Sequence, residues 1–302
     1  MILVAGSANL DFVVRAPHIP MAGETVLGYD FRTYPGGKGA NQAVACARAG
    51  NAETAMLLAL GEDAFAGPIE ASLHEAGVHT HIVRTRDLPT GTAFICVSAV
   101  AENAITVAPG ANEALDASHL PSLAGCTHLL LQLEIPLLTV VAYARAARSQ
   151  GVQVVLNAAP AQSLPEDLLA LVDILIVNEI ELAEVSGRNG DIAHCLERVA
   201  VPCAVVTLGA GGCWARVGHE LMMERGFSVT PVDTTAAGDT FCGVLTAVLS
   251  KRANMQEALR MANAAGALAC TRLGAQSSIP TYDEVAGFLS AQGGMSHSAA
   301  HS

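Results

Sequence analysis

Short apolar runs that recur between helix-like segments most constrain the fold of this chain. Strands that alternate with helices predict βαβ units and a mostly parallel sheet with helices on both faces. The chain is 51% hydrophobic but only 4% aromatic, which suits such a sheet because its buried core is then built from Ala, Val, Leu and Ile. The predicted strands are residues 2–5, 55–60, 128–133, 152–156, 174–177 and 204–208.

Polar residues and glycines follow most of these runs. In an open α/β sheet, ligands bind outside the carboxyl ends of the strands. A single residue of this kind is usually a turn residue, but their recurrence after successive strands predicts a binding site along one edge. The residues in question are Asn9, Asp11, Gly61, Glu134, Asn157, Asn178, Glu181, Thr207, Gly209 and Gly212.

Two segments interrupt the alternation of strands and helices. Residues 12–35 are rich in Pro and Gly, and residues 90–109 alternate in places like a hairpin. They could extend the edge of the main sheet, or they could form a small separate sheet. We favour the separate sheet, which would cover the binding edge as a lid. The whole chain, residues 1–302, would then be one α/β domain.

The segment from Asp233 to Asp239 reads Asp-Thr-Thr-Ala-Ala-Gly-Asp, and apolar residues spaced along one helical face follow it. Small residues at a helix start bring backbone N–H groups together where the helix dipole favours an anion. A carboxylate would repel a phosphate bound there, unless it takes a proton from a hydroxyl that attacks the phosphate. Asp239 is therefore either an ordinary acid of the first helical turn or the base of a phosphoryl-transfer site.

A second glycine-rich turn, residues 35–41, precedes a helix predicted over residues 42–49. It is not a Walker A motif, because Lys38 is followed by glycine and Arg32 stands where the earlier glycine is required. A third turn, residues 209–214, does not match the glycine fingerprint of dinucleotide-binding proteins, because Trp214 stands where the last glycine is required. The Lys38 turn is thus either a tight strand-to-helix connection or a site for a polyhydroxylated ligand.

Composition excludes several classes of protein. A net charge of −12 argues against non-specific binding of nucleic acid, which needs Lys and Arg to neutralise phosphates. The eight cysteines form no CxxC pair, so we expect free thiols in a reducing cytosol. The strand-like start of the chain and the lack of a long apolar stretch argue against a signal peptide and a membrane span. We therefore expect a cytoplasmic protein.

Residues 36–43 and 233–241 resemble the two signatures of the ribokinase family of sugar kinases, also called the phosphofructokinase-B-type family. The resemblance covers nearly the whole chain, and its segments occur in the family's order. It departs from the family at Cys242, where ribokinases often have Asn, and at Asn263, where some members have a His near the adenine. The matching segments are residues 6–11, 36–43, 133–136, 178–181, 207–212, 233–241 and 274–280.

This resemblance implies a ribokinase-like fold and transfer of the γ-phosphoryl group of ATP to the 5-hydroxyl of D-ribose, which gives ribose 5-phosphate. Asp239 would be the base, and the backbone amides of Ala236, Ala237, Gly238 and Asp239 would form the anion hole. The sugar would be held by Asn9, Asp11, Gly37, Lys38, Asn41, Glu134 and Asp239. The nucleotide would be lined by Asn178, Glu181, Thr207, Gly209, Gly212, Gly238 and Asn263.

The resemblance also implies two metal ions and a partner subunit. Mg²⁺ would accompany ATP, with Glu181 near its water shell. A potassium ion beside the anion hole would act as a monovalent activator, and the lid would pair two subunits into a homodimer. The potassium ligands would be the side chains of Asp233 and Ser278 and the carbonyl groups of Thr235, Ala269, Arg272 and Gly274.

The substrate stays open among small sugars. Lys38 and the pair Ala236-Ala237 look more like ribokinases than like fructokinases or nucleoside kinases, and Asp11 suits a sugar with adjacent hydroxyls. The nearest alternative is a kinase for deoxyribose or fructose. A less favoured alternative, from another class, is a sugar- or nucleotide-binding regulator without catalytic activity.

Overall fold

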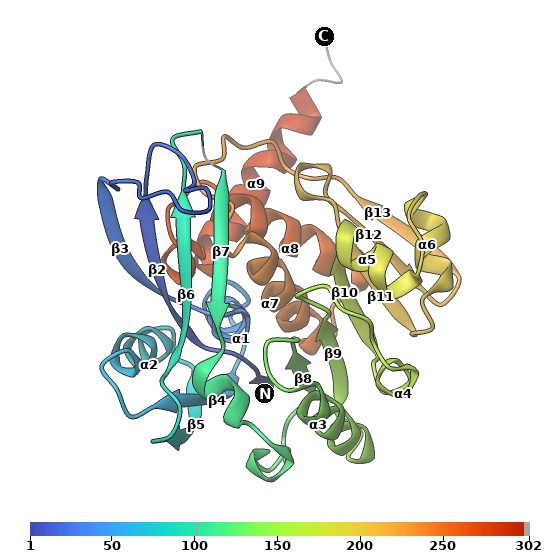
Figure 1. Ribbon diagram of the computed structural model, residues 1–302. Coiled ribbons are helices and arrows are strands. Elements are labelled where there is room, and N and C mark those ends of the chain that lie inside the picture. Colours follow the sequence, from blue (N-terminus) through green and yellow to red (C-terminus); the bar gives the residue numbers. More distant parts are fainter. Residues whose placement is uncertain (101, 299–302) are drawn as a thin grey trace.

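A nine-stranded sheet with helices on both faces forms the body of the computed structural model, which describes residues 1–100 and 102–298 (Figure 1). The strand order is β13-β12-β11-β10-β9-β8-β1-β4-β5, and only β12 and β13 run antiparallel to their neighbours. The strands are β1 (Ile2–Ala5), β4 (Thr54–Gly61), β5 (His79–Thr85), β8 (His128–Leu131), β9 (Gln153–Asn157), β10 (Ile174–Asn178), β11 (Cys203–Thr207), β12 (Cys213–Val217) and β13 (Glu220–Glu224).

The helices divide between the two faces of this sheet. One buried cluster contains Ile2 and Val4 of β1 and residues of α7 and α8. The other contains Leu3 and Ala5 of β1 and residues of α3. No helix in the described part of the chain is long and apolar enough to cross a bilayer. The helices are α1 (Lys38–Val44), α2 (Ala66–Glu75), α3 (Leu137–Ser149), α4 (Glu166–Leu169), α5 (Glu179–Ser186), α6 (Ile192–Arg198), α7 (Ala237–Ser250), α8 (Met255–Ala269) and α9 (Tyr282–Ser298).

All six predicted strands are present, and the mostly parallel order of the sheet confirms the predicted α/β class. Their ends differ from the prediction by two residues at most; β8, for example, ends at Leu131 and not at residue 133. The prediction missed β5, β12 and β13, which lie at the two edges of the sheet. These edge strands carry polar and half-exposed residues, so they lack the continuous apolar run of the central strands.

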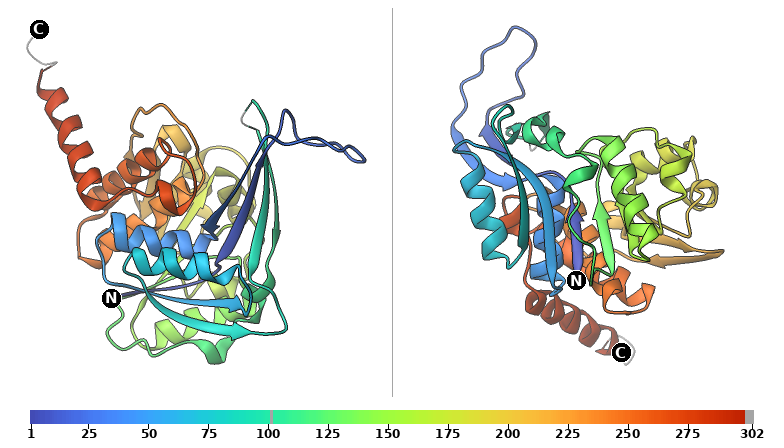
Figure 2. Two further views of the ribbon diagram at one scale, coloured as in Figure 1. Left: turned by 90° about the vertical axis from the view of Figure 1, so that its left-hand side faces the viewer. Right: turned by 90° about the horizontal axis from the view of Figure 1, so that it is seen from below.

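The two segments that interrupt the pattern form a separate four-stranded sheet, in the order β3-β2-β6-β7. We call it the small sheet. β2 pairs antiparallel with β3 and parallel with β6. Figures 1 and 2 show that the small sheet stands beside the main body and that a long loop between β2 and β3 projects from it. Its strands are β2 (Asn9–Arg15), β3 (Asp30–Gly36), β6 (Gly91–Val97) and β7 (Asn103–Ala108).

The glycine-rich turn at residues 35–41 differs from the prediction, because the helix that follows it begins at Lys38 and not at residue 42. Gly37 makes the turn with a φ of 87°, a conformation that glycine adopts without strain. Gly39 then packs so closely on the chain after β1 that an added Cβ would lie 2.7 Å from the nitrogen of Ser7. Lys38 and Asn41 are therefore helical residues, and the helix continues as a π-helical segment, η1 (Ala45–Ala49).

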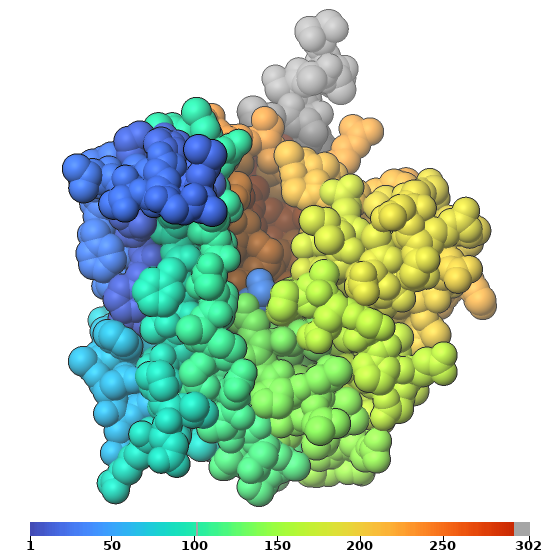
Figure 3. Space-filling view, in the orientation of Figure 1, coloured from blue at the N-terminus to red at the C-terminus, as the bar shows by residue number. Residues whose placement is uncertain are grey.

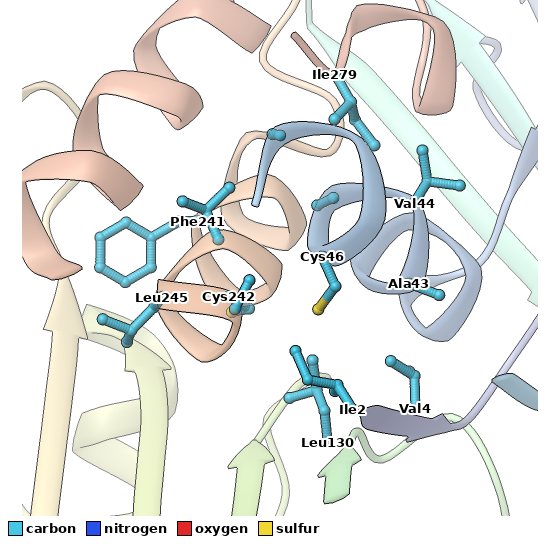
Figure 4. Close-up of a cluster of buried hydrophobic side chains, with 14 of the residues drawn as sticks. Ile2, Val4, Ala43, Val44, Cys46, Leu130, Phe241, Cys242, Leu245 and Ile279 are labelled. Carbon is cyan, nitrogen blue, oxygen red and sulfur yellow. The ribbon is translucent and has the colours of Figure 1, made fainter. Parts of the chain in front are cut away.

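Helices α1 and α7 cross at very short range on the sheet. A Cβ added to Gly243 would lie 2.5 Å from the backbone oxygen of Gln42 and 2.6 Å from the Cβ of Ala45. Figure 4 shows the buried side chains around this crossing, among them Cys46 and Cys242 above the sheet. Because the helices meet without an intervening side chain, the start of α1 lies against the first turn of α7.

We expect Gly243→Ala to lower the free energy of unfolding by about 1–3 kcal/mol, because the added methyl group overpacks the crossing. This loss should exceed the gain of up to about 1 kcal/mol that Ala brings to a helix. Urea unfolding measures the difference. The matched control is Gly67→Ala in α2, where an added Cβ meets nothing within 4 Å. Unchanged or increased stability of the Gly243 variant would contradict the close crossing.

Candidate active site

The small sheet and the start of α7 lie on either side of one groove. Figure 3 shows this hollow between the small sheet, in blue to teal, and the body, with residues of the C-terminal third in orange at its floor. A cavity of about 350 Å³ lies between the small sheet and the loops at residues 231–235 and 273–275. Asp11, Tyr34 and Ile95 line it from the small sheet, so Asp11 borders the groove.

Asp239 lies in the first turn of α7 and is only 9% exposed. Both oxygens of its carboxylate accept hydrogen bonds from amide side chains of α1. Asn41 Nδ2 donates to Oδ2 and Gln42 Nε2 donates to Oδ1, each at 2.9 Å. Two consecutive residues of one helix therefore fix a carboxylate that belongs to another helix.

The backbone before Asp239 turns sharply at Ala236, which has a left-handed φ of 58°. Among the described residues, the N–H groups of Gly238 and Asp239 donate to no backbone acceptor, whereas that of Ala237 is 3.3 Å from the oxygen of Thr234. An added Cβ at Gly238 would meet nothing within 4 Å, so the space beside it is open. Free N–H groups at the start of a 14-residue helix can donate to an anion.

Charged groups gather around the start of α1. Burial raises the pKa of Asp11 to about 7, helped by the charges of Glu134 and Asp239 and opposed by Lys38. The charge of Asp239 is the main reason that the pKa of Lys38 is raised, while burial acts against it. Lys38 is therefore a cation held among carboxylates, close enough to Asp11 and Asp239 for the three charges to influence one another.

Hydrogen bonds hold two of the predicted sugar-binding side chains in place. Glu134 Oε2 accepts from Ser7 Oγ at 2.6 Å and from the backbone nitrogen of Lys38 at 3.1 Å. Asn112 Nδ2 donates to Asn9 Oδ1 at 2.8 Å. Gly91 leaves room for this second pair, because a Cβ there would overlap both amides.

The predicted nucleotide-binding residues follow β10 and β11, apart from Gly238 at the start of α7 and Asn263 on α8. Asn178 and Glu181 form a capping box at the start of α5, since each side chain accepts from the other's backbone nitrogen at 2.8 Å. Burial is the main reason that the pKa of Glu181 is raised. Asn263 donates to the backbone oxygen of Glu224 at 3.3 Å, so it holds α8 against the end of β13. Thr207 is the last residue of β11, and the turn after it contains Gly209 with a φ of 53° and Gly212 with a φ of 93°.

Asp233 joins the two loops that contain most of the predicted potassium ligands. Its Oδ1 accepts from the nitrogen of Thr235 at 2.9 Å, and its Oδ2 accepts from the nitrogen of Gly274 at 3.0 Å. Ser278 is fully buried and donates to the oxygen of Ala275, which leaves its lone pairs free. The described residues contain no group of three or more His, Cys, Asp or Glu side chains that could hold a metal. A cation here would therefore need carbonyl and hydroxyl oxygens as ligands.

Sequence reasoning missed the polar side chains that support the site. It assigned no role to Ser7, Gln42, Asn112 or Gln132, and it marked Asn157 only as a residue past a strand. Gln42 follows Asn41 directly in the glycine-rich segment, and such adjacency was a usable signal. The other contacts join residues about 100 positions apart, for example Asn9 and Asn112, so no local pattern could indicate them.

The family model for pfkB family carbohydrate kinases matches residues 1–282 of this chain. The chain is 39% identical over 298 residues to a ribokinase of Haemophilus influenzae, with 95% of this chain and 97% of that protein covered. It is 31% identical over 303 residues to a deoxyribokinase of Salmonella typhi, with 96% of this chain and 98% of that protein covered.

Solved structures agree with these relatives in fold. A ribokinase from Thermotoga maritima superposes with a TM-score of 0.88 at 35% identity, covering 96% of this chain and 99% of that one. An Arabidopsis thaliana ribokinase complexed with ribose and ATP superposes with a TM-score of 0.87 at 30% identity, covering 95% of this chain and 98% of that one.

Proposed function

Because the chain belongs to the pfkB family of carbohydrate kinases, we propose that it transfers the γ-phosphoryl group of ATP to the 5-hydroxyl of D-ribose. The observation that carries the proposal is the buried carboxylate of Asp239 beside the free N–H groups at the start of α7. A carboxylate in an anion site opposes phosphate binding, so it is useful there only if it removes a proton during phosphoryl transfer.

In this mechanism Asp239 accepts the proton of the 5-hydroxyl while the hydroxyl oxygen attacks the γ-phosphorus. The bond between the γ-phosphorus and the oxygen that bridges it to the β-phosphate breaks, and ADP leaves with that oxygen. The N–H groups of Gly238 and Asp239 donate to the phosphoryl oxygens as charge redistributes. By analogy with oxyanion holes, a preorganised donor of this kind contributes about 10²–10³ in rate.

The proposed sugar site lies between the small sheet and α1. Asp11 can accept from two neighbouring hydroxyls of the sugar, and Glu134 and Asn9 are already held by Ser7 and Asn112. Oδ1 of Asn41 is buried and has no hydrogen-bond partner among the described residues, which supports a role as acceptor for a sugar hydroxyl. Gly37 and Lys38 complete the site at the turn into α1.

The substrate is tested by comparing phosphorylation of ribose, 2-deoxyribose and fructose with ATP. We expect kcat/KM for ribose to exceed that for the other two by at least about tenfold. A site built for a hydroxyl leaves polar groups unpaired when 2-deoxyribose lacks it, and fructose brings an additional carbon and hydroxyl into a site built for a pentose. Preference for deoxyribose, the substrate class of the Salmonella relative, would contradict the proposed substrate but not the kinase. Failure to phosphorylate any sugar would favour the non-catalytic regulator.

For Mg²⁺ we propose that the phosphates of ATP provide most ligands and that Glu181 lies near its water shell. One oxygen of Glu181 is used in the capping box, and the other has no partner among the described residues. This fits an outer-shell role and not direct coordination by a carboxylate cluster. Glu181→Gln should raise the Mg²⁺ concentration needed for half-maximal rate, and an unchanged requirement would exclude the role.

For K⁺ we propose the site that joins the 233–235 and 269–278 segments. The donor set fits a large monovalent cation: the Asp233 carboxylate keeps lone pairs beyond its two N–H bonds, and the Ser278 hydroxyl is buried with free lone pairs. The remaining ligands would be the carbonyl groups of Thr235, Ala269, Arg272 and Gly274. A cation here would neutralise Asp233 and hold the loop that leads into the anion hole.

Replacing Na⁺ with K⁺ at constant ionic strength should raise kcat several-fold, because the larger ion fits a site of carbonyl and hydroxyl oxygens. The control is Asp233→Asn, which removes the negative charge of the site. This variant should show a smaller difference in kcat between KCl and NaCl. Equal initial rates in KCl and NaCl for the unaltered protein would contradict the potassium site.

We also propose a homodimer through the small sheet and a cytoplasmic location. Phe12 stacks against Phe31 and Phe94 on the face of the small sheet away from the groove, and the latter two are 62% and 54% exposed. An exposed aromatic face of this kind supports a protein interface. Phe94→Glu should give a monomer in sedimentation, and a monomeric unaltered protein would contradict the dimer.

The proposed cytoplasmic location is supported by the cysteines. All eight are free thiols, as expected in a reducing compartment, and cell fractionation tests the location.

A further inference from the structure

Three buried amide side chains lie in a row behind Asp239. Gln42 and Gln132 are fully buried and Asn157 is nearly so. Gln132 Nε2 donates to Gln42 Oε1 at 2.6 Å, and Gln42 Nε2 donates both to Asp239 Oδ1 and to Asn157 Oδ1 at 2.9 Å. Gln42 of α1 thus contacts one oxygen of the proposed base, and it is itself held by Gln132 from the segment after β8 and by Asn157 at the end of β9.

The contacts of Gln42 permit only one orientation of its amide group. Both N–H bonds meet oxygen acceptors, and the amide oxygen meets an N–H donor. Asn157 cannot turn to accommodate a reversed Gln42, because its own Nδ2 donates to the backbone oxygen of Ile176 at 3.1 Å. A reversed Gln42 amide would place its oxygen against the oxygens of Asp239 and Asn157. Gln42 is therefore fixed as a donor to Asp239.

Several charged or titratable groups act on Asp239 from the elements packed around it. Lys38 on α1 is the cation, and the carboxylates of Asp11 on β2 and Glu181 on α5 carry the same charge as Asp239. Cys242 on α7 has its pKa raised by burial and by the charge of Asp239. Burial and like charges disfavour an ionised carboxylate, whereas donated hydrogen bonds favour it.

We propose that Gln42 is a positioning residue for the phosphoryl transfer, which holds the carboxylate of Asp239 in place as a hydrogen-bond donor, and that Gln132 and Asn157 fix the donor orientation of Gln42. The inference rests on the proposed function, because it concerns the base of that reaction. Asn41 donates to the other oxygen of Asp239, but it also belongs to the proposed sugar site. Gln42 contacts the base and has no place in the sugar or nucleotide site, so its contribution can be measured separately.

The first test is Gln42→Met, which keeps the length of the side chain and removes both N–H donors. We expect kcat with ribose and ATP to fall by about 10- to 100-fold, as for a displaced catalytic group. The dissociation constant of ribose, measured by calorimetry, should change by less than about twofold, because no sugar contact is lost. The acid limb of the kcat–pH profile should move to higher pH, because the carboxylate loses a hydrogen-bond donor.

A second variant, Gln132→Met, keeps Gln42 but removes the donor to its amide oxygen, so it should move kcat and the pH profile in the same direction by a smaller amount. This variant decides the question by the same criteria if Gln42→Met does not fold. The matched control is Thr246→Val on α7, which removes a buried hydroxyl that donates to the oxygen of Cys242 at 2.8 Å without contact with Asp239. Its kcat and pH profile should match those of the unaltered protein.

The inference is overturned if Gln42→Met retains full kcat, if its loss of kcat comes without a shift of the pH profile, or if ribose binding weakens in proportion. These failures differ from failure of the proposed function, which would appear as an unaltered protein that does not phosphorylate ribose. An active unaltered protein together with an unaffected Gln42 variant would remove only the positioning role.

Discussion

The short crossing of α1 over α7 is the constraint on which the site depends. Gly243 allows the backbone of Gln42 to approach α7, and this approach places two amide side chains against the carboxylate of Asp239. The same helix start contains Lys38, which belongs to the proposed sugar site. One helix therefore fixes the base and borders the substrate, so the distance between the base and the hydroxyl depends on how the two helices pack.

Electrostatics in the groove follow from the same arrangement. Asp11, Glu134, Glu181 and Asp239 are acidic groups around one cation, Lys38. Such a set is costly to bury in an unliganded protein, and the pKa of Asp11 near 7 reflects that cost. A polyhydroxylated ligand offers hydroxyl donors to these carboxylates, and the free N–H groups at the start of α7 offer donors to an anion. The two halves of the groove thus suit two chemically different ligands.

The sequence was sufficient to predict the central strands and to identify the segments that approach the groove. Continuous apolar runs identify buried parallel strands. The glycine-rich segments indicate that a helix follows each of them, but α1 begins at Lys38 and not at residue 42, because the turn itself needs only Gly37 in a left-handed conformation. Edge strands such as β5 and β13 could not be identified, since half-exposed strands lack such runs. The amides behind Asp239 also could not be assigned a role. Gln132 and Asn157 reach Gln42 only through tertiary contacts that no local spacing predicts.

The proposed mechanism depends on Asp239 as the base that takes the proton of the 5-hydroxyl. Asp239→Asn tests it most directly, because asparagine keeps the shape of the side chain and cannot take the proton. Turnover of ribose should fall by about 10²–10⁴-fold, while the dissociation constant of ribose in calorimetry should stay within about threefold. Turnover close to that of the unaltered protein would contradict the claim, and so would a loss of ribose binding as large as the loss of turnover.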